Sequence, residues 1–422
     1  MAYTLGIIAF AVGIMAAVCL HEAGHMGTAK MFGMKVSRYF VGFGPTLWSF
    51  RRGETEYGVK ALPLGGFVKI VGMTPQDDDV DPADEPRAMW RFPVWKRTVV
   101  MMAGSVTHFI LAFVILWIMF VMIGVPDGTK IDKVKPKVAS VSSCVVVSWQ
   151  LDSSGEGPRP CTASDPKSPA AQAGLRSGDV ITAINGVALP TYAAMRTAVR
   201  ALGDTDATIT YNRDGKTHTA NVHIYAADRI KDGVDSSKSY AAITPNDLER
   251  AGLLGITGEA PRTTVGAVEG VTTSGRYMGT LVGVTFKSLG QLPGKIPNLF
   301  AALAGKQRDP NTPVSVIGAS RMGGELAQRR DWTSLLHLFA VLNLFFGLFN
   351  LFPLLPMDGG HIAISWFERL RTWAYVRLGR ADPGRVDYYK LTPITLTVIG
   401  VLGLFVVLTG TADIINPITL NR

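Results

Sequence analysis

Four long apolar spans divide the chain of 422 residues into polar segments, and they are the most regular pattern in the sequence. Each span has about the 20 residues or more that a helix needs to cross a bilayer. A buried core helix is the alternative for each, but such lengths argue against it for the second, third and fourth. The pattern predicts a polytopic α-helical membrane protein with four transmembrane helices, in contact with membrane lipid. The spans are Thr4–Met31, Thr98–Pro126, Thr333–Met357 and Leu391–Ala412.

The first span resembles a secretory signal only in its length. Residues 1–20 contain no Lys or Arg, so the basic segment that opens a signal peptide is missing. We therefore expect this span to stay in the membrane as a helix.

The polar segment after the first span predicts β-structure rather than helix. Thr55, Tyr57 and Val59 alternate with other residues, and an apolar run at 64–70 follows Pro63. Strands cannot expose open edges to lipid, but they can dip into the bilayer where protein covers them. We expect a re-entrant, membrane-associated β-hairpin at about residues 41–73, within a first membrane part of residues 1–126.

Basic residues concentrate in the segments 30–97 and 369–390. The positive-inside rule places both segments in the cytosol, and it places the amino terminus, residues 127–332 and the carboxyl terminus outside. The net charge of +9 fits basic loops against anionic lipid and requires no nucleic-acid partner. The acidic run at 76–86 is expected to be a solvated loop. A calcium site is the alternative there, although the spacing matches no EF-hand.

Residues 130–226 predict a small α/β domain outside the membrane. Ser168 opens a short helix, Gly174 ends it, a strand follows at 180–184, and Asn185–Gly186 is typical of a hairpin turn. The run closely resembles the signature of PDZ domains, which bind extended peptides by adding a strand to a sheet edge. A PDZ domain that only limits by size what reaches the membrane is the alternative, and the sequence leaves both open.

An amphipathic region, residues 227–332, is expected to connect this domain to a second membrane part, residues 333–422. Interfacial helices are one interpretation, and packing against the membrane part is the other. Gly294, Pro297 and Pro313 are expected to break the helical pattern.

The chain has three cysteines, two in the predicted external segment and one in the first apolar span. Cys144 and Cys161 lie in the external segment, on either side of a turn signal at 153–158, and oxidising surroundings favour a disulfide between them. Two free thiols are the alternative. Cys19 lies in the first span, where a buried apolar thiol is expected.

The first span contains the sequence His21-Glu22-Ala23-Gly24-His25. On a helix this HExxH spacing places both imidazoles on one face, where they can bind one Zn²⁺. Glu22 between them can act on water that the metal polarises. A glutamate at membrane depth indicates a functional site, whereas a coincidental pair of histidines is the alternative. The motif predicts a zinc hydrolase.

A third metal ligand is expected from another span, since a catalytic zinc has three protein ligands and one open position. Asp358 ends the third apolar run, after Pro353 and Pro356 and directly before Gly359 and Gly360. The prolines release backbone carbonyls from the helix, and the glycines allow close backbone approach. A solvated helix-terminal aspartate is the alternative. His361 is a competing ligand, although a role in supporting the ligands or on the helix surface is expected for it.

Together these features resemble the site-2 protease family, most of all its bacterial PDZ-containing members that regulate sigma factors, and the actinobacterial branch in particular. The resemblance rests on HEAGH, on LPLGGFVKIVGM at 62–73, on the PDZ signature and on NLFPLLPMDGG at 350–360. It implies an intramembrane zinc metalloprotease of the bacterial plasma membrane, whose ligands are His21, His25 and Asp358 and whose catalytic glutamate is Glu22.

The resemblance also implies how substrate is held. The membrane-associated hairpin of the family maps onto Arg51–Met73, where a substrate segment is added as a strand along Gly65, Gly66, Phe67, Val68 and Lys69. The family asparagine maps onto Asn350, which positions substrate or fixes its loop. Implied substrates are transmembrane proteins, such as anti-sigma factors already trimmed outside, and remnants of signal peptides. The end of an inward-running first span places the active site toward the cytosolic side.

One position departs from the family. Many members carry GPxxN early in the second span, where this chain has Gly104-Ser105-Val106-Thr107-His108. His108 replaces the asparagine, and it either contacts substrate or zinc or, in the interpretation we favour, forms an interior hydrogen bond.

Two other functions compete with a protease. A catalytically degenerate membrane receptor would use only the PDZ domain, yet all four chemical residues are intact. A zinc transporter would need polar residues along several spans, and the second and fourth are nearly devoid of them. The sequence indicates neither a particular substrate nor an oligomeric state.

Overall fold

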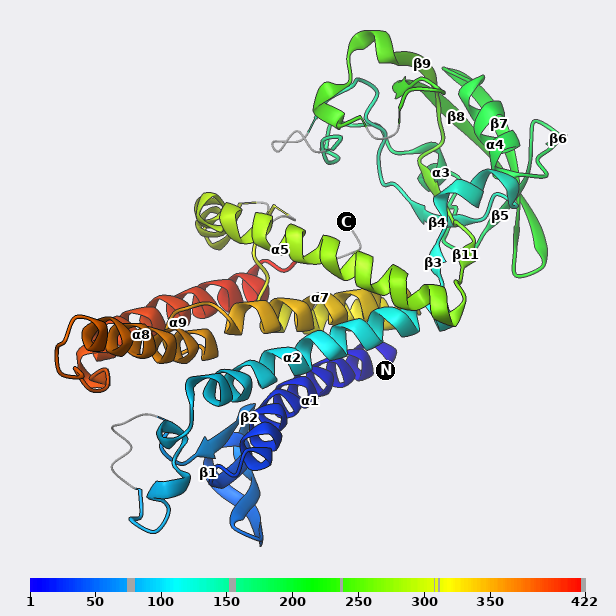
Figure 1. Ribbon diagram of the computed structural model, residues 1–422. Coiled ribbons are helices and arrows are strands. Elements are labelled where there is room, and N and C mark those ends of the chain that lie inside the picture. The colour runs from blue at the N-terminus through cyan, green and yellow to red at the C-terminus, as the bar shows by residue number, and fades with distance from the viewer. Residues whose placement is uncertain (74–79, 152–156, 236–237, 307, 310–311, 419–422) are drawn as a thin grey trace. The chain divides into compact units, whose positions relative to one another are not determined.

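The computed structural model describes residues 1–73, 80–151, 157–235, 238–306, 308–309 and 312–418. The chain forms two compact units, one of residues 1–124 with 264–422 and the other of residues 125–263 (Figure 1). Residues 76–79 of the acidic run and residues 153–156 of the turn predicted between the two cysteines lie outside the described residues.

Within the described residues, four helices of the first unit are long and apolar enough to cross a membrane, as the four apolar spans predict. Figure 1 shows α1, α2 and α7 side by side. On α9, seven valine, leucine and isoleucine side chains are 59–63% exposed, which suits a surface that faces lipid. The helices are α1 (Ala2–Met31), α2 (Val94–Ile118, prolonged by the π-helical turn η3, Met119–Ile123), α7 (Trp332–Asn350) and α9 (Thr392–Ile415).

The third of these helices ends at Asn350, earlier than the apolar span that predicts it. Pro353 and Pro356 lack the N–H that would continue the helix, so the chain turns before α8 (Asp358–Arg377) begins. A Cβ on Gly359 would lie 2.2 Å from the Leu351 carbonyl oxygen. The glycines therefore allow the first turn of α8 to pack on this turn and fix the place of Asp358.

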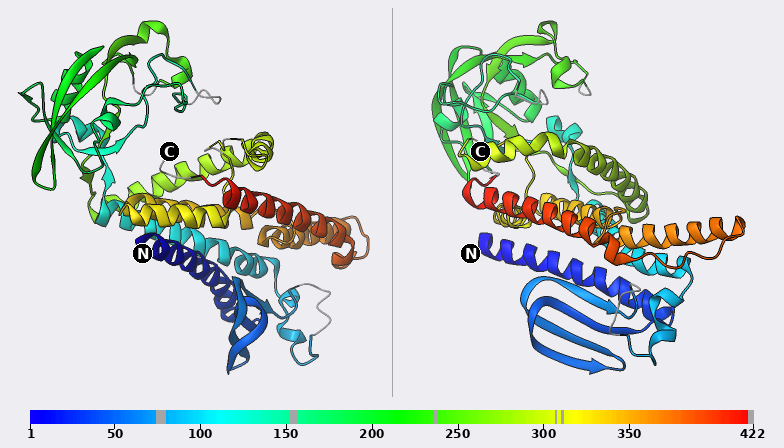
Figure 2. Two further views of the ribbon diagram at one scale, coloured as in Figure 1. Left: turned by 180° about the vertical axis from the view of Figure 1, so that it is seen from behind. Right: turned by 90° about the vertical axis from the view of Figure 1, so that its left-hand side faces the viewer.

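The segment after α1 forms β1 (Val36–Arg52) and β2 (Thr55–Ile70), so the predicted β-structure is present and begins before residue 41. Phe40 lies opposite both Gly58 and Phe67. The part of β1 around Phe40 is thus flanked by two parts of β2, and residues 66–70 form an outer strand of the sheet. Figure 2 shows this sheet beside the end of α1.

Two further helices complete the helical unit, α5 (Ala267–Leu303) and α6 (Val316–Gln328). Contrary to the predicted breaks, α5 continues through Gly294 and Pro297, with Leu299 and Ala302 beyond them fully buried. Burial of these side chains outweighs the one hydrogen bond that a proline removes. Pro313 does precede α6. Short 3₁₀ turns are η1 (Glu85–Arg87), η2 (Met89–Arg91) and η7 (Tyr388–Leu391).

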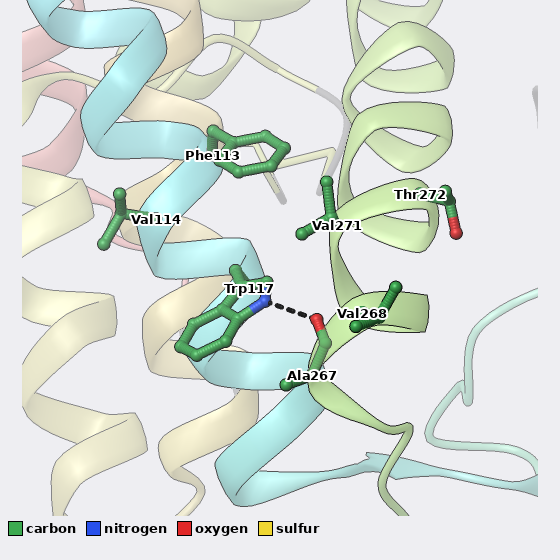
Figure 3. A pocket seen from close by; sticks show the side chains of 7 residues that line it. All are labelled: Phe113, Val114, Trp117, Ala267, Val268, Val271 and Thr272. Carbon is green, nitrogen blue, oxygen red and sulfur yellow. Dashed lines mark hydrogen bonds between the residues drawn. The ribbon is translucent and has the colours of Figure 1, made fainter.

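A cavity of about 490 Å³ lies between α2 and the first turns of α5 (Figure 3). Trp117 Nε1 closes one side by donating a hydrogen bond to the Ala267 carbonyl, at 3.0 Å. The lining is apolar except for Thr272 and includes none of the predicted metal ligands. It consists of Phe113, Val114, Trp117, Ala267, Val268, Val271 and Thr272.

The second unit is an α/β fold around a five-stranded sheet with the order β6-β5-β7-β8-β9. Ala207, Ile209 and Tyr211 alternate on β7 and point into a core that also holds Ile181 and Ile224. The sheet strands are β5 (Val180–Ile184), β6 (Val187–Ala188), β7 (Thr205–Arg213), β8 (Lys216–Ile230) and β9 (Leu248–Leu253).

Local structure in this unit follows the predicted order. Ser168 caps α3 (Pro169–Gln172), Gly174 follows with φ +66°, and Asn185 and Gly186 both have positive φ in the turn between β5 and β6. The unit also contains α4 (Tyr192–Arg200), the strand pairs β3 (Val125–Pro126) with β11 (Arg262–Thr263) and β4 (Val138–Val141) with β10 (Ile256–Gly258), and the turns η4 (Gly128–Lys133), η5 (Tyr240–Ala242) and η6 (Pro245–Asp247).

The second unit is larger than the predicted range 130–226. Strand β9 pairs with β8 from Tyr225↔Leu253 to Ile230↔Leu248, so part of the predicted connecting region belongs to this sheet. The remainder of that region, from Thr264, belongs to the helical unit.

Candidate metal centre

His21, His25 and Asp358 meet in the helical unit, although Asp358 lies more than 300 positions away in the sequence. The two Nε2 atoms are 3.1 Å apart, and each lies 3.3 Å from Asp358 Oδ2. Ligand atoms bound at 2.0–2.1 Å to a tetrahedral Zn²⁺ lie about 3.3 Å from one another. The three atoms therefore have the spacing of one face of a zinc tetrahedron.

Burial and hydrogen bonding at these atoms also suit a cation. His21 and His25 are 6% and 4% exposed. Asp358 Oδ2 is buried and accepts no hydrogen bond from the described residues. A buried carboxylate oxygen without a donor is costly unless a positive charge lies beside it. The donor set and its spacing thus fit a zinc ion.

Helix α2 orients one of the two imidazoles. His25 Nδ1 donates a hydrogen bond of 2.7 Å to the Val100 carbonyl oxygen, which leaves the lone pair on Nε2. Such a bond from the nitrogen that does not bind metal is the usual means of fixing a metal-binding histidine.

Two glycines allow α1 and α2 to approach closely at this level. A Cβ on Gly24 would lie 2.7 Å from the Ala103 carbonyl oxygen, and one on Gly104 would lie 2.4 Å from His25 Nε2. Neither contact is possible for a larger residue without movement of the ligands or of the helices. The backbone of α2 therefore forms one wall of the metal centre.

Glu22 lies between the centre and the β-sheet. Its Oε2 accepts a hydrogen bond of 3.0 Å from the backbone N–H of Val68 in β2. A Cβ on Gly66 would lie 3.7 Å from Glu22 Cγ. The candidate catalytic carboxylate and the predicted substrate-binding strand are thus in direct contact.

His108 is fully buried and packs against His21, with ring centroids 5.1 Å apart. His108 Nδ1 lies 3.0 Å from Asn343 Oδ1, and Asn343 Nδ2 donates to the Phe339 carbonyl at 2.9 Å. Because the Asn343 amide hydrogens face Phe339, its Oδ1 accepts from His108 Nδ1–H. The interior hydrogen bond that we favoured for His108 is present, and its partner is Asn343.

The other predicted site residues take different places. Asn350 is the last residue of α7, and its side chain makes no hydrogen bond within the described residues. His361 stacks on Tyr388, burial lowers the pKa of its imidazole, and it is not among the residues whose ligand atoms converge. Gly65–Lys69 form the outer part of the sheet, and Gly65 has φ +119°.

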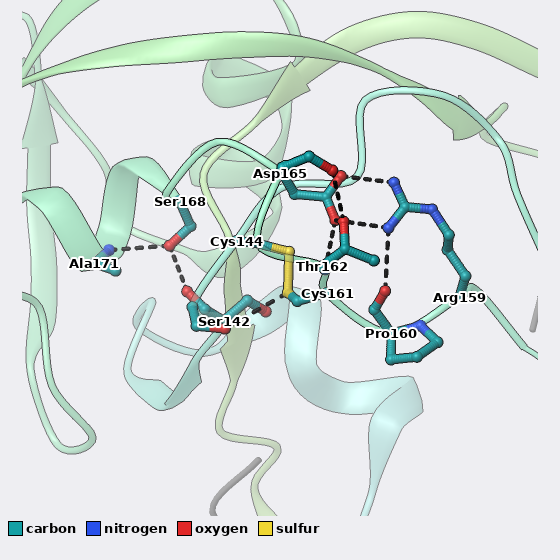
Figure 4. The surroundings of a disulfide bond; sticks show 11 residues. Ser142, Cys144, Arg159, Pro160, Cys161, Thr162, Asp165, Ser168 and Ala171 are labelled. Atoms are coloured by element: carbon teal, nitrogen blue, oxygen red, sulfur yellow. Dashed lines mark hydrogen bonds and ion pairs between the residues drawn. A yellow bond between two sulfur atoms is a disulfide. The ribbon is translucent and has the colours of Figure 1, made fainter. Parts of the chain in front are cut away.

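Cys144 and Cys161 lie in the α/β unit and are joined by a disulfide, with their Cα atoms 5.9 Å apart (Figure 4). Arg159 forms two hydrogen bonds of 2.6 Å to Asp165 within the same segment. Cys19 is the free cysteine of the described residues, and its carbonyl accepts from the Tyr39 hydroxyl at 2.7 Å.

Comparison with known proteins identifies the family. The sequence profile of peptidase family M50 matches residues 9–377. This chain belongs to peptidase family M50. It is 37% identical to zinc metalloprotease Rip1 of Mycolicibacterium smegmatis and 38% identical to zinc metalloprotease Rip1 of Mycobacterium tuberculosis, in both cases over the full length of both chains. It is 26% identical to a putative zinc metalloprotease of Nostoc sp., over 96% of this chain and 95% of that one.

These comparisons confirm the predicted site-2 protease family, the zinc metalloprotease class and the Zn²⁺ cofactor. With the four apolar helices, they also show an integral membrane protein.

Sequence reasoning missed three features of the centre. Asn343 and the Val100 carbonyl gave no motif, and Gly104 appeared only as part of a departure from GPxxN. A signal for Gly104 was present, because it precedes His108 by one helical turn and so lies on the same face of α2.

Proposed function

We propose that this metalloprotease cleaves single-span membrane proteins within or near the bilayer, with His21, His25 and Asp358 as its zinc ligands. The observation that carries the proposal is the convergence of three ligand atoms, at 3.1–3.3 Å, two of which belong to a helix with the length and composition of a transmembrane segment. A peptide bond in a membrane helix is hydrogen-bonded and shielded from water. Its hydrolysis requires a centre that holds both a water molecule and an unwound substrate at that depth.

The metal would supply a Lewis acid that lowers the pKa of water and polarises the substrate carbonyl. The Glu22 carboxylate, whose Oε2 accepts from the Val68 N–H in this structure, would take a proton from the attacking water. The same carboxyl group then delivers that proton to the leaving amine. Asn350 is proposed as a hydrogen-bond donor to substrate from the end of α7.

We propose that substrate is held as an added strand along Gly65, Gly66, Phe67, Val68 and Lys69. The outer position of this segment in the sheet supports the proposal, since β1 pairs with it on one side only. A strand added there would hold the substrate extended, which removes the helical hydrogen bonds that protect its peptide groups.

The α/β unit is proposed to be a PDZ domain outside the plasma membrane of a bacterium, with the active site toward the cytosolic side. The short capped α3, the positive φ of Gly174 and the Asn185–Gly186 turn support a PDZ fold. The proposed substrates are anti-sigma factors already trimmed outside, and remnants of signal peptides, in regulated intramembrane proteolysis.

Two substitutions test the site assignment. We expect Glu22→Gln to retain zinc and to lose at least the 10²–10⁴-fold contribution that acid–base catalysis makes. We expect Asp358→Ala to lose both zinc and activity, because it removes a ligand. Metal analysis of the purified protein and cleavage of a single-span reporter measure both effects, with the exposed Asp206→Ala as the control.

Two results would refute the assignment. Cleavage by the Glu22→Gln protein at more than a tenth of the unsubstituted rate would remove Glu22 from the mechanism. Stoichiometric zinc in the Asp358→Ala protein would mean that another group completes the metal site.

A further inference from the structure

In the outer segment of β2, residues 66–70, the backbone N–H of Val68 points away from β1 and already donates a hydrogen bond. Tyr39 lies opposite Val68, and Phe40 lies opposite Phe67, so β1 covers one side of residues 66–70. Along a strand, successive backbone N–H groups point to opposite sides. The N–H groups that share the side of the Val68 N–H therefore belong to every second residue. The N–H of Val68 points away from β1 and donates to Glu22 Oε2 at 3.0 Å.

Helix α1 lies close to this segment of β2. A Cβ on Gly65 would lie 3.9 Å from Val18 Cγ1, and one on Gly66 would lie 3.9 Å from Cys19 Sγ. Tyr39 in β1 donates from its hydroxyl to the Cys19 carbonyl at 2.7 Å. The position of Glu22 relative to Val68 is therefore fixed by several contacts besides their own hydrogen bond.

A carboxylate oxygen at Val68 N–H occupies the position that a substrate carbonyl takes in an added strand. An N–H carries one hydrogen and makes one strong hydrogen bond, so Glu22 and a substrate strand cannot both accept from it with good geometry. We propose that Glu22 competes with substrate for the N–H of Val68, and that strand addition releases the carboxylate for catalysis. This inference rests on the proposed strand addition along Gly65–Lys69.

The competition couples two events in one hydrogen bond. Without substrate, the carboxylate that would deprotonate water is held by the strand. When a substrate carbonyl takes over the N–H, the carboxylate is released beside that same carbonyl. Val68 is thus a positioning residue that acts through Glu22, and the peptide bond that is cut lies next to the substrate residue that pairs with Val68.

Two inactive variants separate competition from catalysis. Glu22→Gln retains an oxygen that can accept from Val68, whereas Glu22→Met has nearly the same length and no such acceptor. Both lack the carboxylate charge, and the Val68→Pro background described below separates this hydrogen bond from their difference in polarity. The probe is a fluorescent single-span peptide of leucine and alanine with a central Gly–Ser pair and lysines at both ends, added to the zinc-loaded full chain in lipid nanodiscs.

We expect the Glu22→Met protein to bind the probe about threefold to tenfold more tightly than the Glu22→Gln protein, the effect of one neutral hydrogen bond. Without the probe, the Val68 amide hydrogen should exchange slowly in the unsubstituted and Glu22→Gln proteins and faster in the Glu22→Met protein. In a Val68→Pro background, which removes the N–H at an outer strand where proline is tolerated, the affinity ratio should fall to one.

Each outcome decides between the two proposals. Equal affinities of the Gln and Met variants, with amides of residues 66–70 protected by the probe, would overturn the competition and leave strand addition standing. Probe binding without protection of these amides, or no binding to any variant, would overturn strand addition itself and the competition with it. Unchanged Val68 exchange in the Glu22→Met protein would overturn the competition alone.

Discussion

At the scale of single residues, the candidate metal centre depends on the absence of side chains as much as on their presence. His25 is held by the Val100 carbonyl, and this requires the backbone of α2 to lie against the imidazoles. Gly104 is the point of closest approach, since any Cβ there would lie 2.4 Å from His25 Nε2.

We therefore expect Gly104→Ala to reduce zinc binding at least tenfold while the protein still folds. The added methyl group must displace a ligand nitrogen or move α2, and a displaced ligand changes the coordination geometry. Equilibrium zinc affinity, measured by competition with a chelator, checks this. Gly27→Ala on α1 is the matched control, because a Cβ at Gly27 meets no atom within 4 Å. Equal zinc affinities of the two variants would contradict the close approach of α2.

A second residue, Asp179, contributes to the acid stability of the α/β unit. Burial would raise the pKa of Asp179, but hydrogen bonds from the Arg213 guanidinium and the Arg176 N–H outweigh it and hold this pKa below its ordinary value. A carboxyl group whose pKa is lower in the folded state stabilises that state above its unfolded pKa, about 3.9, and loses this effect as the pH falls through its folded pKa.

We expect the contribution of Asp179 to the unfolding free energy of this unit to be constant from pH 7 to about pH 5 and to fall below about pH 4. Asp179→Ala should cost roughly 2 kcal/mol at pH 7, because Arg213 and the Arg176 N–H lose their acceptor. Hydrogen exchange of β5, β7 and β8 peptides in the full chain measures both. An unchanged acid dependence in the Asp179→Ala protein would show that other carboxylates govern it.

Local sequence patterns were enough to predict the three side chains that the structure brings together, His21, His25 and Asp358, but not what surrounds them. HExxH and the Asp358 segment are local patterns whose chemistry is visible in the letters. The bond between His108 and Asn343 joins residues 235 positions apart, and only the packing of α2 against α7 brings them together. The periodicity of one helix does not predict which residue of another helix will lie against it.

At the scale of elements, composition predicted the kind of segment better than its ends. The four apolar spans are helices, but α7 stops at Asn350, where the prolines that follow cannot donate. Helix α5 shows the reverse error, since it continues through Pro297 because the side chains beyond are buried. In both cases tertiary packing and the available backbone donors decide where the helix ends, and neither can be predicted from hydrophobicity.

The disulfide between Cys144 and Cys161 offers a test of whether the α/β unit lies outside the membrane, in an oxidising compartment. Its disulfide closes 17 positions, and such bonds persist in oxidising surroundings. In protein from its native membrane, we expect both thiols to resist alkylation without reductant and both to be labelled after reduction. Mass spectrometry of the two peptides decides this. Labelling before reduction would argue against an external α/β unit, and Cys19 labelled after denaturation serves as the control for the reagent.

At the scale of the whole molecule, the proposed chemistry and the α/β unit are separate in the chain. His21, Glu22, His25 and Asp358 all belong to the helical unit. Val125 and Thr263, the ends of the α/β unit, are paired in the ladder of β3 with β11. The two cut ends left by removal of residues 125–263 therefore start from neighbouring positions, and a short Gly–Ser linker can join Gly124 to Thr264.

Both sides of that junction have anchors of their own. The Gly124 carbonyl accepts from the Thr333 hydroxyl at 3.1 Å, and the Val265 N–H donates to the Phe120 carbonyl at 3.1 Å.

We expect the protein without residues 125–263 to bind zinc and to cleave a single-span reporter. It should also cut an untrimmed substrate more readily, because the proposed PDZ domain would no longer limit by size what approaches the membrane. Rates on trimmed and untrimmed reporters measure this, with Glu22→Gln in the shortened protein as the blank. A zinc-loaded but inactive shortened protein would contradict the size limit, and it would mean that the α/β unit must bind substrate before the chemistry can begin.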